Sequence, residues 1–509
     1  MKKPVRILET KQSVVYGCIF LCSLLMSFIA TNNPFLIGNT YVDSSVFNYV
    51  ARVILKGGMP YRDTFDHKGP LLYLIDALGQ LIRESLGLWF IELITLFLIF
   101  LLAYKIAKLV GCNNIRSLLV VLICMVSMAL YFEGGNLVEE YACLFIMLQL
   151  YIFLQFFMDK DISTFQLIVS GFSFGAVCLL RINMVSLWIV MCIGVLIKCI
   201  KEKKPQMLGR FIIWFLVGAC IIILPIMIWL IAGGAFNPFI EDYFSFNFLY
   251  SSHSGNGSLI NIIKAIALFM MTPPVVLSLI ILAFVGFKDK KFLDFLCLAA
   301  LLLSVLMQCM AGQSFFHYGM VFCPIVVYAF SKAFTSEHIT GLKIFKHKAR
   351  LFLGLCAALV LCVIVLIIID FPIKAVMDKV TGIGKNFSDA KTVSDIVAKN
   401  TDDNDKIIVL GNNDIIYLLS HRESYSKYSY QDPIIMIDAD KKEEFLTDIR
   451  KLETKIIVES PQCYIRLPGK SFLEFLRPAR YKHFRSPSFY TILHKYKTAR
   501  DQHQVFYIS

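Results

Sequence analysis

Charged residues are scarce in this chain. Of its 509 residues, Asp, Glu, Lys and Arg make up 17%, whereas hydrophobic residues make up 57%. A composition so poor in charge excludes a soluble globular protein and predicts a polytopic membrane protein. The net charge of +13 does not indicate nucleic acid binding. The Lys and Arg residues lie in short loops between apolar runs, where they form no continuous basic face.

Motifs for metals, disulfides and nucleotides are also missing. The sequence has no Cys-x-x-Cys and no His-Cys spacing typical of a metal site, and most of its fifteen cysteines lie in apolar runs. Residues 371–509 contain one cysteine, Cys463, so we expect no disulfide within them. No Gly-x-Gly-x-x-Gly occurs, which leaves nucleotide binding unsupported. We predict no resident cofactor, although acidic outer-loop residues could hold a divalent cation.

Long apolar runs dominate the first 370 residues. A run of about twenty residues crosses the hydrocarbon core. The charged N-terminus before the first run is similar to a signal peptide, but no small-residue cleavage site follows, which predicts an uncleaved first span. We predict about eleven spans, near 13–31, 87–109, 116–132, 138–157, 164–181, 183–200, 210–232, 262–286, 292–310, 317–334 and 350–370.

Loop charges predict the orientation of these spans. If the N-terminus is cytoplasmic, the inner loops are rich in Lys and Arg, whereas the outer loops 131–140, 233–261 and 311–316 contain none. This asymmetry predicts that the C-terminal region lies outside the cell membrane. The run LLYLIDALGQLI (71–82) is too short to span, so we expect an amphipathic helix in the outer interface.

The composition changes after Asp370. β-Branched runs at 405–411 and 454–460 alternate with helical patterns at 388–400 and 438–452. Strands that alternate with helices predict a small α/β domain with a partly parallel sheet. We therefore expect two domains: a transmembrane domain over 1–370, whose first outer loop is 32–86 with interfacial helices, and an extracytoplasmic α/β domain over 371–509.

The first outer loop begins with Asp43, in the helical pattern DSSVFNYVARVIL. One interpretation is a helix cap, since Asp precedes the apolar pattern. The other is a general base, because partial desolvation at a membrane surface raises the pKa of a carboxyl group. A single residue can serve both purposes.

The same loop contains PYRDTFDHKGP (60–70), which gathers two carboxylates, a histidine and two cations. Its prolines and glycine interrupt any helix. A solvated loop whose charges compensate one another would explain the composition without chemistry. Alternatively, a cation such as Lys68 or His67 could hold a phosphate, while Tyr61, Arg62 and Asp66 contact the substrate.

Three further outer segments carry polar candidates. The loop EGGNLVEEY (133–141) offers Glu139 and Glu140, which could position a hydroxyl or simply satisfy topology. Arg181 ends an apolar run on the outer side, against the orientation rule, and a lipid phosphate is its natural partner. His317 and Tyr318 lie at the outer entry of a span, where an aromatic belt would explain the tyrosine without chemistry. We also count Tyr318 among the candidate substrate ligands.

In this order, the features resemble the GT-C superfamily of bacterial membrane glycosyltransferases. The branch includes protein O-mannosyltransferases and lipid A aminoarabinose transferases. The resemblance rests on the first-loop acid, the segment PYRDTFDHKGP, the acidic second loop, the late His-Tyr pair and the extracytoplasmic end domain. It implies transfer of a sugar, a hexose or a pentose, from a polyprenyl-phosphate donor at the outer face, with inversion.

The resemblance also assigns roles to residues. It implies that Asp43 is the base, that Lys68 contacts the donor phosphate and that Glu139 or Glu140 is the second-loop catalytic carboxylate. We add His67, Arg181 and His317 as candidate phosphate ligands, because their side chains can carry a positive charge.

The expected acceptor is a cell-envelope glycan, lipid or protein. One alternative is a transporter or flippase of lipid-linked sugars, which predicts ionisable residues buried near the middle of several spans. Another is a sensor whose 371–509 domain binds a wall polymer. Chemistry that survives removal of 371–509 would favour the enzyme over the sensor.

Overall fold

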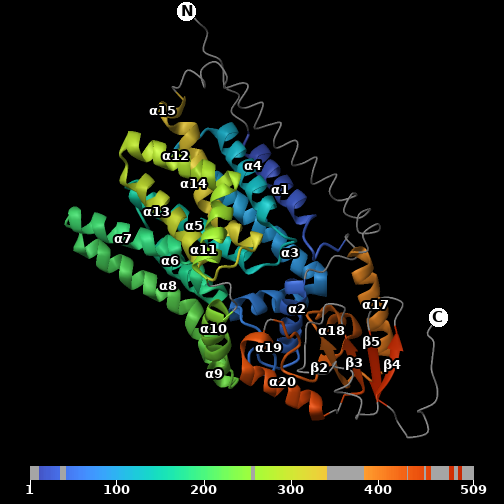
Figure 1. Cartoon of the computed structure of the whole chain (residues 1–509). Coiled ribbons are helices and arrows are strands. Elements are labelled where there is room, and N and C mark those ends of the chain that lie inside the picture. The colour runs from blue at the N-terminus through green and yellow to red at the C-terminus, as the bar shows by residue number, and fades with distance from the viewer. Residues whose placement is uncertain are drawn as a thin grey trace, which may run out of the picture. The chain divides into compact units, whose positions relative to one another are not determined.

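The computed structural model describes residues 11–34, 42–253, 258–340, 383–432, 434–451, 454–459, 481–485 and 491–495 (Figure 1). The chain divides into two compact units. The helical unit takes the described parts of Met1–Asn33, Ser85–Met227 and Gly255–Asp370. The loop unit takes the described parts of Pro34–Glu84, Ile228–Ser254 and Phe371–Ser509. The predicted first outer loop, whose described residues up to Glu84 belong to this unit, therefore shares it with the C-terminal region.

Long apolar helices form the helical unit. Among the described residues, six helices are long and apolar enough to cross a membrane, or seven if one bent pair counts as a single span. The chain is thus a multi-pass membrane protein. The main helices are α1 (Gln12–Ser27), α3 (Pro70–Val110), α4 (Asn114–Tyr131), α5 (Val138–Phe157), α6 (Thr164–Leu180), α7 (Ser186–Lys201), α8 (Pro205–Ala232), α11 (Leu259–Met271), α12 (Pro273–Asp289), α13 (Phe292–Cys309) and α14 (Cys323–Thr335). The predicted span 350–370 lies outside the described residues.

Two predicted elements differ from the structure. The segment 262–286 is not one straight span, because α11 and α12 meet at Thr272 with a bend of 77°. Pro273 and Pro274 cannot donate the hydrogen bonds that would continue α11, but they suit the first turn of a new helix. The segment 71–82 is helical, as predicted, but it continues into the following span as the 41-residue α3.

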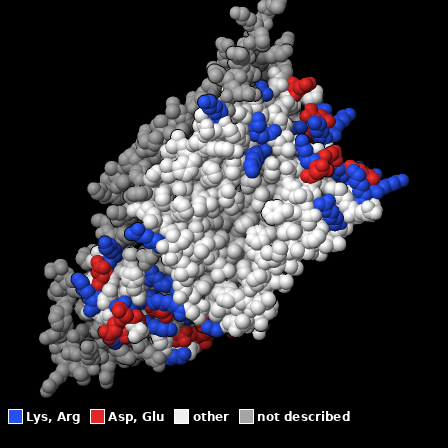
Figure 2. Space-filling model, turned by 180° about the vertical axis from the view of Figure 1, so that it is seen from behind, with Lys and Arg blue, Asp and Glu red and all other residues white. Residues whose placement is uncertain are grey.

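Helices α6 and α8 approach each other through small residues. A Cβ atom added at Gly171 would overlap the backbone of Phe215, and one added at Gly218 would overlap the backbone of Ile168. The two glycines thus permit backbone contact between neighbouring apolar helices, a common way to pack helices in membranes. On the face shown in Figure 2, a broad area over the helices carries no charged side chain, as a lipid-facing surface requires.

A five-stranded sheet lies in the loop unit, with the strand order β2-β1-β3-β5-β4. β1 (Lys406–Leu410) is parallel to β2 (Glu423–Ser424) and to β3 (Ile456–Glu459), whereas β5 (Thr491–Lys495) is antiparallel to β3 and to β4 (Tyr481–Arg485). Its helices are α17 (Ile383–Lys399), α18 (Ile415–Ser420), α19 (Ile434–Ile437) and α20 (Ala439–Lys451). The prediction of a small α/β region with a partly parallel sheet is confirmed.

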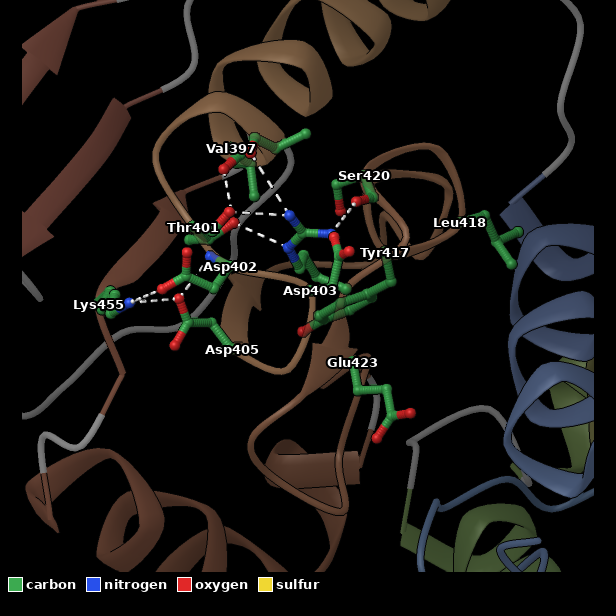
Figure 3. A network of polar contacts seen from close by, with 12 residues as sticks. Val397, Thr401, Asp402, Asp403, Asp405, Tyr417, Leu418, Ser420, Glu423 and Lys455 are labelled. Carbon is green, nitrogen blue, oxygen red and sulfur yellow. Dashed lines mark hydrogen bonds and ion pairs between the residues drawn. The ribbon is translucent and has the colours of Figure 1, made fainter. Parts of the chain in front are cut away.

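Helix α2 (Val42–Leu55) of the first outer loop packs into this α/β region. Tyr49 belongs to the same buried cluster as residues of α17, β1 and α18, and its hydroxyl accepts a 2.8 Å hydrogen bond from the backbone N–H of Ser424. Arg52 donates to the carbonyl oxygens of Leu418 (2.8 Å) and Tyr417 (3.2 Å), two residues labelled in Figure 3. The helix that begins the first outer loop is therefore built into the C-terminal fold.

Candidate active site

Asp43 lies in the first turn of α2 and is half-buried. The helix predicted from its sequence pattern is confirmed. A carboxylate in this position interacts favourably with the helix dipole, so Asp43 can stabilise α2. Its role as a general base stays a prediction, and the two roles are compatible.

Residues 60–70 divide into a buried set and an accessible set. Tyr61 and Asp66 are buried, at 0% and 2% exposure. Tyr61 donates a 2.7 Å hydrogen bond to the carbonyl oxygen of Lys68. Asp66 accepts three hydrogen bonds of 2.7 Å, from the hydroxyls of Tyr73 and Tyr430 and from the backbone N–H of His67. Both predicted substrate ligands thus hold the loop in shape.

Arg62 is exposed and lies beside Asp63. Its Nε and NH2 groups donate to the Asp63 carboxylate at 2.8 and 2.6 Å, and its NH1 group donates to the carbonyl oxygen of Gly233. The bonds from Arg62 lower the pKa of Asp63. This predicted substrate residue therefore joins the first outer loop to the segment after α8.

His67 and Lys68 are the half-buried members of the segment. The Lys68 ammonium lies 3.1 Å from His67 Nε2. The His67 ring contacts Phe246 and Tyr250 edge-on, with centroid distances of 5.6 and 6.0 Å. A supported cation that still reaches solvent is the arrangement needed to bind an anion.

In the helical unit, the structure brings together predicted residues from separate loops. Arg181, which follows α6, donates to Glu139 Oε1 at 2.8 Å and to the Tyr318 hydroxyl at 3.0 Å. Its guanidinium also stacks over the Tyr318 ring at 4.3 Å from the centroid. The Glu139 side chain is 3% exposed, so this ion pair is largely shielded from water. Sequence alone gave no indication that Arg181 and Glu139 would pair.

His317 forms a second acid–base contact in this unit. Its Nδ1 lies 2.5 Å from Glu133 Oε2. Glu133 opens a turn in which Asn136 also has a positive φ, of 52°, and two glycines lie between them. The turn aims Glu133 at His317. The two predicted phosphate ligands of the helical unit, Arg181 and His317, therefore each hold a carboxylate.

The neighbouring acids Glu139 and Glu140 have different environments. Glu140 is fully buried, and its Oε2 accepts a 2.9 Å hydrogen bond from the backbone N–H of Asn136. The Asn136 side chain accepts in turn from the Tyr141 hydroxyl at 2.9 Å. Glu140 thus stabilises the turn before α5, whereas Glu139 contacts a cation. Within the part of the chain that the structure describes, no group of three His, Cys, Asp or Glu residues could hold a metal ion.

Sequence reasoning missed several polar residues. Glu92 is a buried carboxylate within an otherwise apolar span and accepts from Asn32 Nδ2 at 3.3 Å. Its charge in an apolar run was a usable signal. Asp242 is buried and binds the ammonium groups of Lys441 (2.7 Å) and Lys427 (3.4 Å). No sequence pattern indicated this cluster, since its members lie far apart in the chain.

Comparison with known families and structures gives three results. The family model described as "Putative competence-induced protein Ccs4 N-terminal domain" matches residues 7–366. No curated protein matches the chain. Two solved structures of ArnT from Cupriavidus metallidurans are similar, both at 10% identity. The one bound to undecaprenyl phosphate has a TM-score of 0.60 over 96% of this chain and 99% of ArnT. The apo one has a TM-score of 0.58 over 94% and 97%.

A third structure comes from an archaeon. The oligosaccharyltransferase AglB from Archaeoglobus fulgidus, in complex with an inhibitory peptide and a dolichol-phosphate, is 13% identical. It has a TM-score of 0.50 and covers 88% of this chain and 69% of AglB. ArnT, an aminoarabinose transferase, and AglB are both GT-C glycosyltransferases.

Proposed function

The chain belongs to the Ccs4 N-terminal domain family and has the GT-C fold, and we propose that it is a membrane glycosyltransferase. In this proposal, a hexose or pentose moves from a polyprenyl-phosphate donor to a cell-envelope glycan, lipid or protein. The reaction takes place at the outer face of the membrane. The topology that goes with it has about eleven spans, with the N-terminus inside and the C-terminal domain outside. Support comes from the fold, and from ArnT having been crystallised with undecaprenyl phosphate.

One observation carries the proposal: the half-buried pair of His67 and Lys68 in a segment whose other parts are anchored. Tyr61 and Tyr73 both bond to the Lys68 backbone, and buried Asp66 fixes the residue before the pair. These hydrogen bonds fix the Lys68 backbone while its ammonium remains accessible to solvent, an arrangement that suits binding of an anionic ligand. A loop whose charges only compensate one another would not require it.

The proposed reaction is an inverting displacement. Asp43 accepts the proton of the acceptor hydroxyl as its oxygen forms a bond to the anomeric carbon. The bond from that carbon to the phosphate oxygen breaks, and polyprenyl phosphate leaves with the electron pair. Lys68, supported by His67, stabilises the leaving phosphate.

The second-loop residues have a revised place in the proposal. Because Glu139 is paired with Arg181, we assign it the positioning of Arg181 and Tyr318, and we assign Glu140 the support of the turn. Arg181 and His317 stay candidate phosphate ligands that would exchange a carboxylate for the donor. A divalent cation is not required, since phosphate is a good leaving group.

The transporter alternative has less support. It predicts buried charges near the middle of the spans. Among the described spans, the buried charged residues lie within about two turns of an end of their span: Glu92, Glu139, Glu140, Asp294 and Lys332. The sensor alternative leaves the supported cation unexplained.

Transfer of radiolabelled sugar from polyprenyl-phosphate donors tests the proposal. Membranes would contain the native chain, Asp43→Asn, Lys68→Ala or the control Lys264→Ala at matched protein levels. We expect Asp43→Asn to abolish transfer while donor binding persists, Lys68→Ala to weaken donor binding, and the control to match the native chain. Full transfer by Asp43→Asn would rule out Asp43 as the base. Absence of transfer by the native chain from every donor would contradict the enzyme.

A further inference from the structure

The side-chain amide of Asn247 has one defined orientation. Its Nδ2 lies 2.8 Å from the carbonyl oxygen of His67 and 2.8 Å from that of Tyr243. Both partners are acceptors, so this atom must be the NH2 group. The opposite amide orientation would place oxygen against two carbonyl oxygens. The atom that faces His67 Nδ1 at 2.9 Å is therefore the carbonyl oxygen Oδ1.

This orientation determines the tautomer of His67. Since Asn247 Oδ1 can only accept, His67 Nδ1 carries the proton and donates it. In the neutral ring, Nε2 then holds the lone pair. This lone pair faces the Lys68 ammonium at 3.1 Å and accepts one of its N–H groups. Within the part of the chain that the structure describes, the two other N–H groups of Lys68 have no partner, so they can bind another ligand.

The segment that carries Asn247 is itself fixed. Asn247 is the second residue of α10 (Phe246–His253), which follows the π-helix η2 (Ile240–Ser245). Within η2, buried Asp242 binds Lys427 and Lys441 of the α/β region. π-Helical turns are rare and are often found at functional sites. The ion pairs of Asp242 therefore hold the segment that presents the Asn247 amide to His67, within the same unit.

We propose that Asn247 is a positioning residue for the donor phosphate: it fixes the Nδ1–H tautomer of His67, whose Nε2 in turn aims the Lys68 ammonium. The inference rests on the proposed role of Lys68. It adds a chain of three residues in which only Lys68 touches the phosphate. It also adds a requirement for neutral His67, because a protonated Nε2 would turn an N–H toward the ammonium.

Acid should therefore weaken donor binding. The groups that face the His67 ring include the Lys68 ammonium, the Asn247 amide, and the rings of Phe246 and Tyr250. The Asp66 carboxylate binds the His67 backbone N–H. An imidazole ordinarily titrates near pH 6.5. Replacement of Asn247 by Asp would place a carboxylate against Nδ1 and favour the charged ring, so the loss on acidification would begin at higher pH.

Binding of undecaprenyl phosphate to the purified full-length protein tests the inference. The comparison takes native chain, Asn247→Leu, Asn247→Asp and the exposed control Asn237→Leu, with the thermal midpoint of each recorded. We expect Asn247→Leu to raise the Kd about tenfold, with KM for the donor rising and kcat within about twofold of native. We expect Asn247→Asp to lose affinity at a higher pH than the native chain, and Asn237→Leu to match native.

The outcomes separate this inference from the proposed function. If Lys68→Ala weakens binding but Asn247→Leu does not, the positioning role is wrong and the phosphate contact stands. If Lys68→Ala binds as tightly as native, the proposed contact itself fails. Should Asn247→Leu fail to fold, the pH dependence of Asn247→Asp decides, and an unchanged pH dependence overturns the inference.

Discussion

The hydroxyl of Tyr430 donates a 2.7 Å hydrogen bond to Asp66, 364 residues earlier in the chain. Tyr73 donates to the other carboxylate oxygen of Asp66 at 2.7 Å. Phe65 adds a third contact to this junction between residues 65–73 and residues 427–430: its backbone N–H donates to the carbonyl oxygen of Lys427 at 2.8 Å. The first outer loop and the C-terminal α/β region therefore share one interior. The C-terminal region is part of the framework of the loop.

Removal of residues 371–509 should therefore abolish transfer, contrary to the expectation that the chemistry survives it. A milder test is Tyr430→Phe, which removes one hydrogen bond to a buried carboxylate and should cost about 1–3 kcal/mol of stability. Tyr16→Phe, at an exposed position in α1, serves as the control. Thermal unfolding of the purified protein measures both. Equal midpoints for Tyr430→Phe and native would show that this hydrogen bond does not stabilise the junction.

The contributions of Arg181 and Glu139 to stability should be coupled, because the two side chains form one ion pair. Breaking a shielded pair leaves one charge uncompensated, so we expect Glu139→Gln and Arg181→Gln each to cost roughly 3 kcal/mol. The double variant should cost clearly less than the two added together. The ion pair of Asp159 and Lys198 is the control because the Asp159 side chain is 77% exposed, and Asp159→Asn should cost under about 1 kcal/mol. Additive losses in the thermal midpoints would contradict the coupling.

Local sequence patterns predicted the helices and strands of this protein better than they predicted which segments contact one another. The 3.6-residue period of 43–55 predicted α2, and the β-branched runs predicted β1 and β3 with their parallel pairing. The bend at Thr272 was readable from the two prolines that follow it, yet the apolar run alone favoured one span. The periodicity of apolar residues shows which segments prefer a helix or a strand, and this pattern can be read from a short stretch of sequence.

The contacts between distant segments could not be predicted in this way. Glu139 and Glu140 are equivalent in sequence, and only the packing of α5 against Arg181 separates their roles. Asp66 looked like an exposed loop residue because its partner Tyr430 follows after more than 300 residues. A buried carboxylate needs donors, but the sequence does not say which segments supply them.

Stability of the α/β region should depend on pH through Asp414. Burial raises the pKa of this carboxyl to about 7, although the Ser429 hydroxyl donates a 2.6 Å hydrogen bond to it. Between the ordinary value of about 4 and this value, the folded state binds a proton that the unfolded state has lost. Stability should therefore fall as the pH rises from about 4 to 7. Asn carries no charge, so Asp414→Asn should flatten this part of the curve of thermal midpoint against pH. A parallel curve for the variant would assign the dependence to other groups.

Arg422 should tolerate replacement by Lys poorly, although the charge is kept. Its side chain is 4% exposed and donates to Thr401 and Ser420, which are labelled in Figure 3. The guanidinium donates to the Thr401 hydroxyl (2.9 Å), the Thr401 carbonyl oxygen (2.8 Å) and the Ser420 carbonyl oxygen (3.1 Å). A single ammonium cannot reach this planar set of acceptors, so buried oxygens would lose their donors.

We expect Arg422→Lys to lower stability by about 2–4 kcal/mol, since two or more hydrogen bonds to buried acceptors are lost. Arg450→Lys is the matched control, because its ion pair with Glu443 is exposed and should contribute under about 1 kcal/mol. Sugar transfer should fall along with the stability of Arg422→Lys, because α2 and its Asp43 rest on α18, next to this network. A variant that loses stability but transfers sugar at the native rate would show that α2 keeps its place without a rigid C-terminal support.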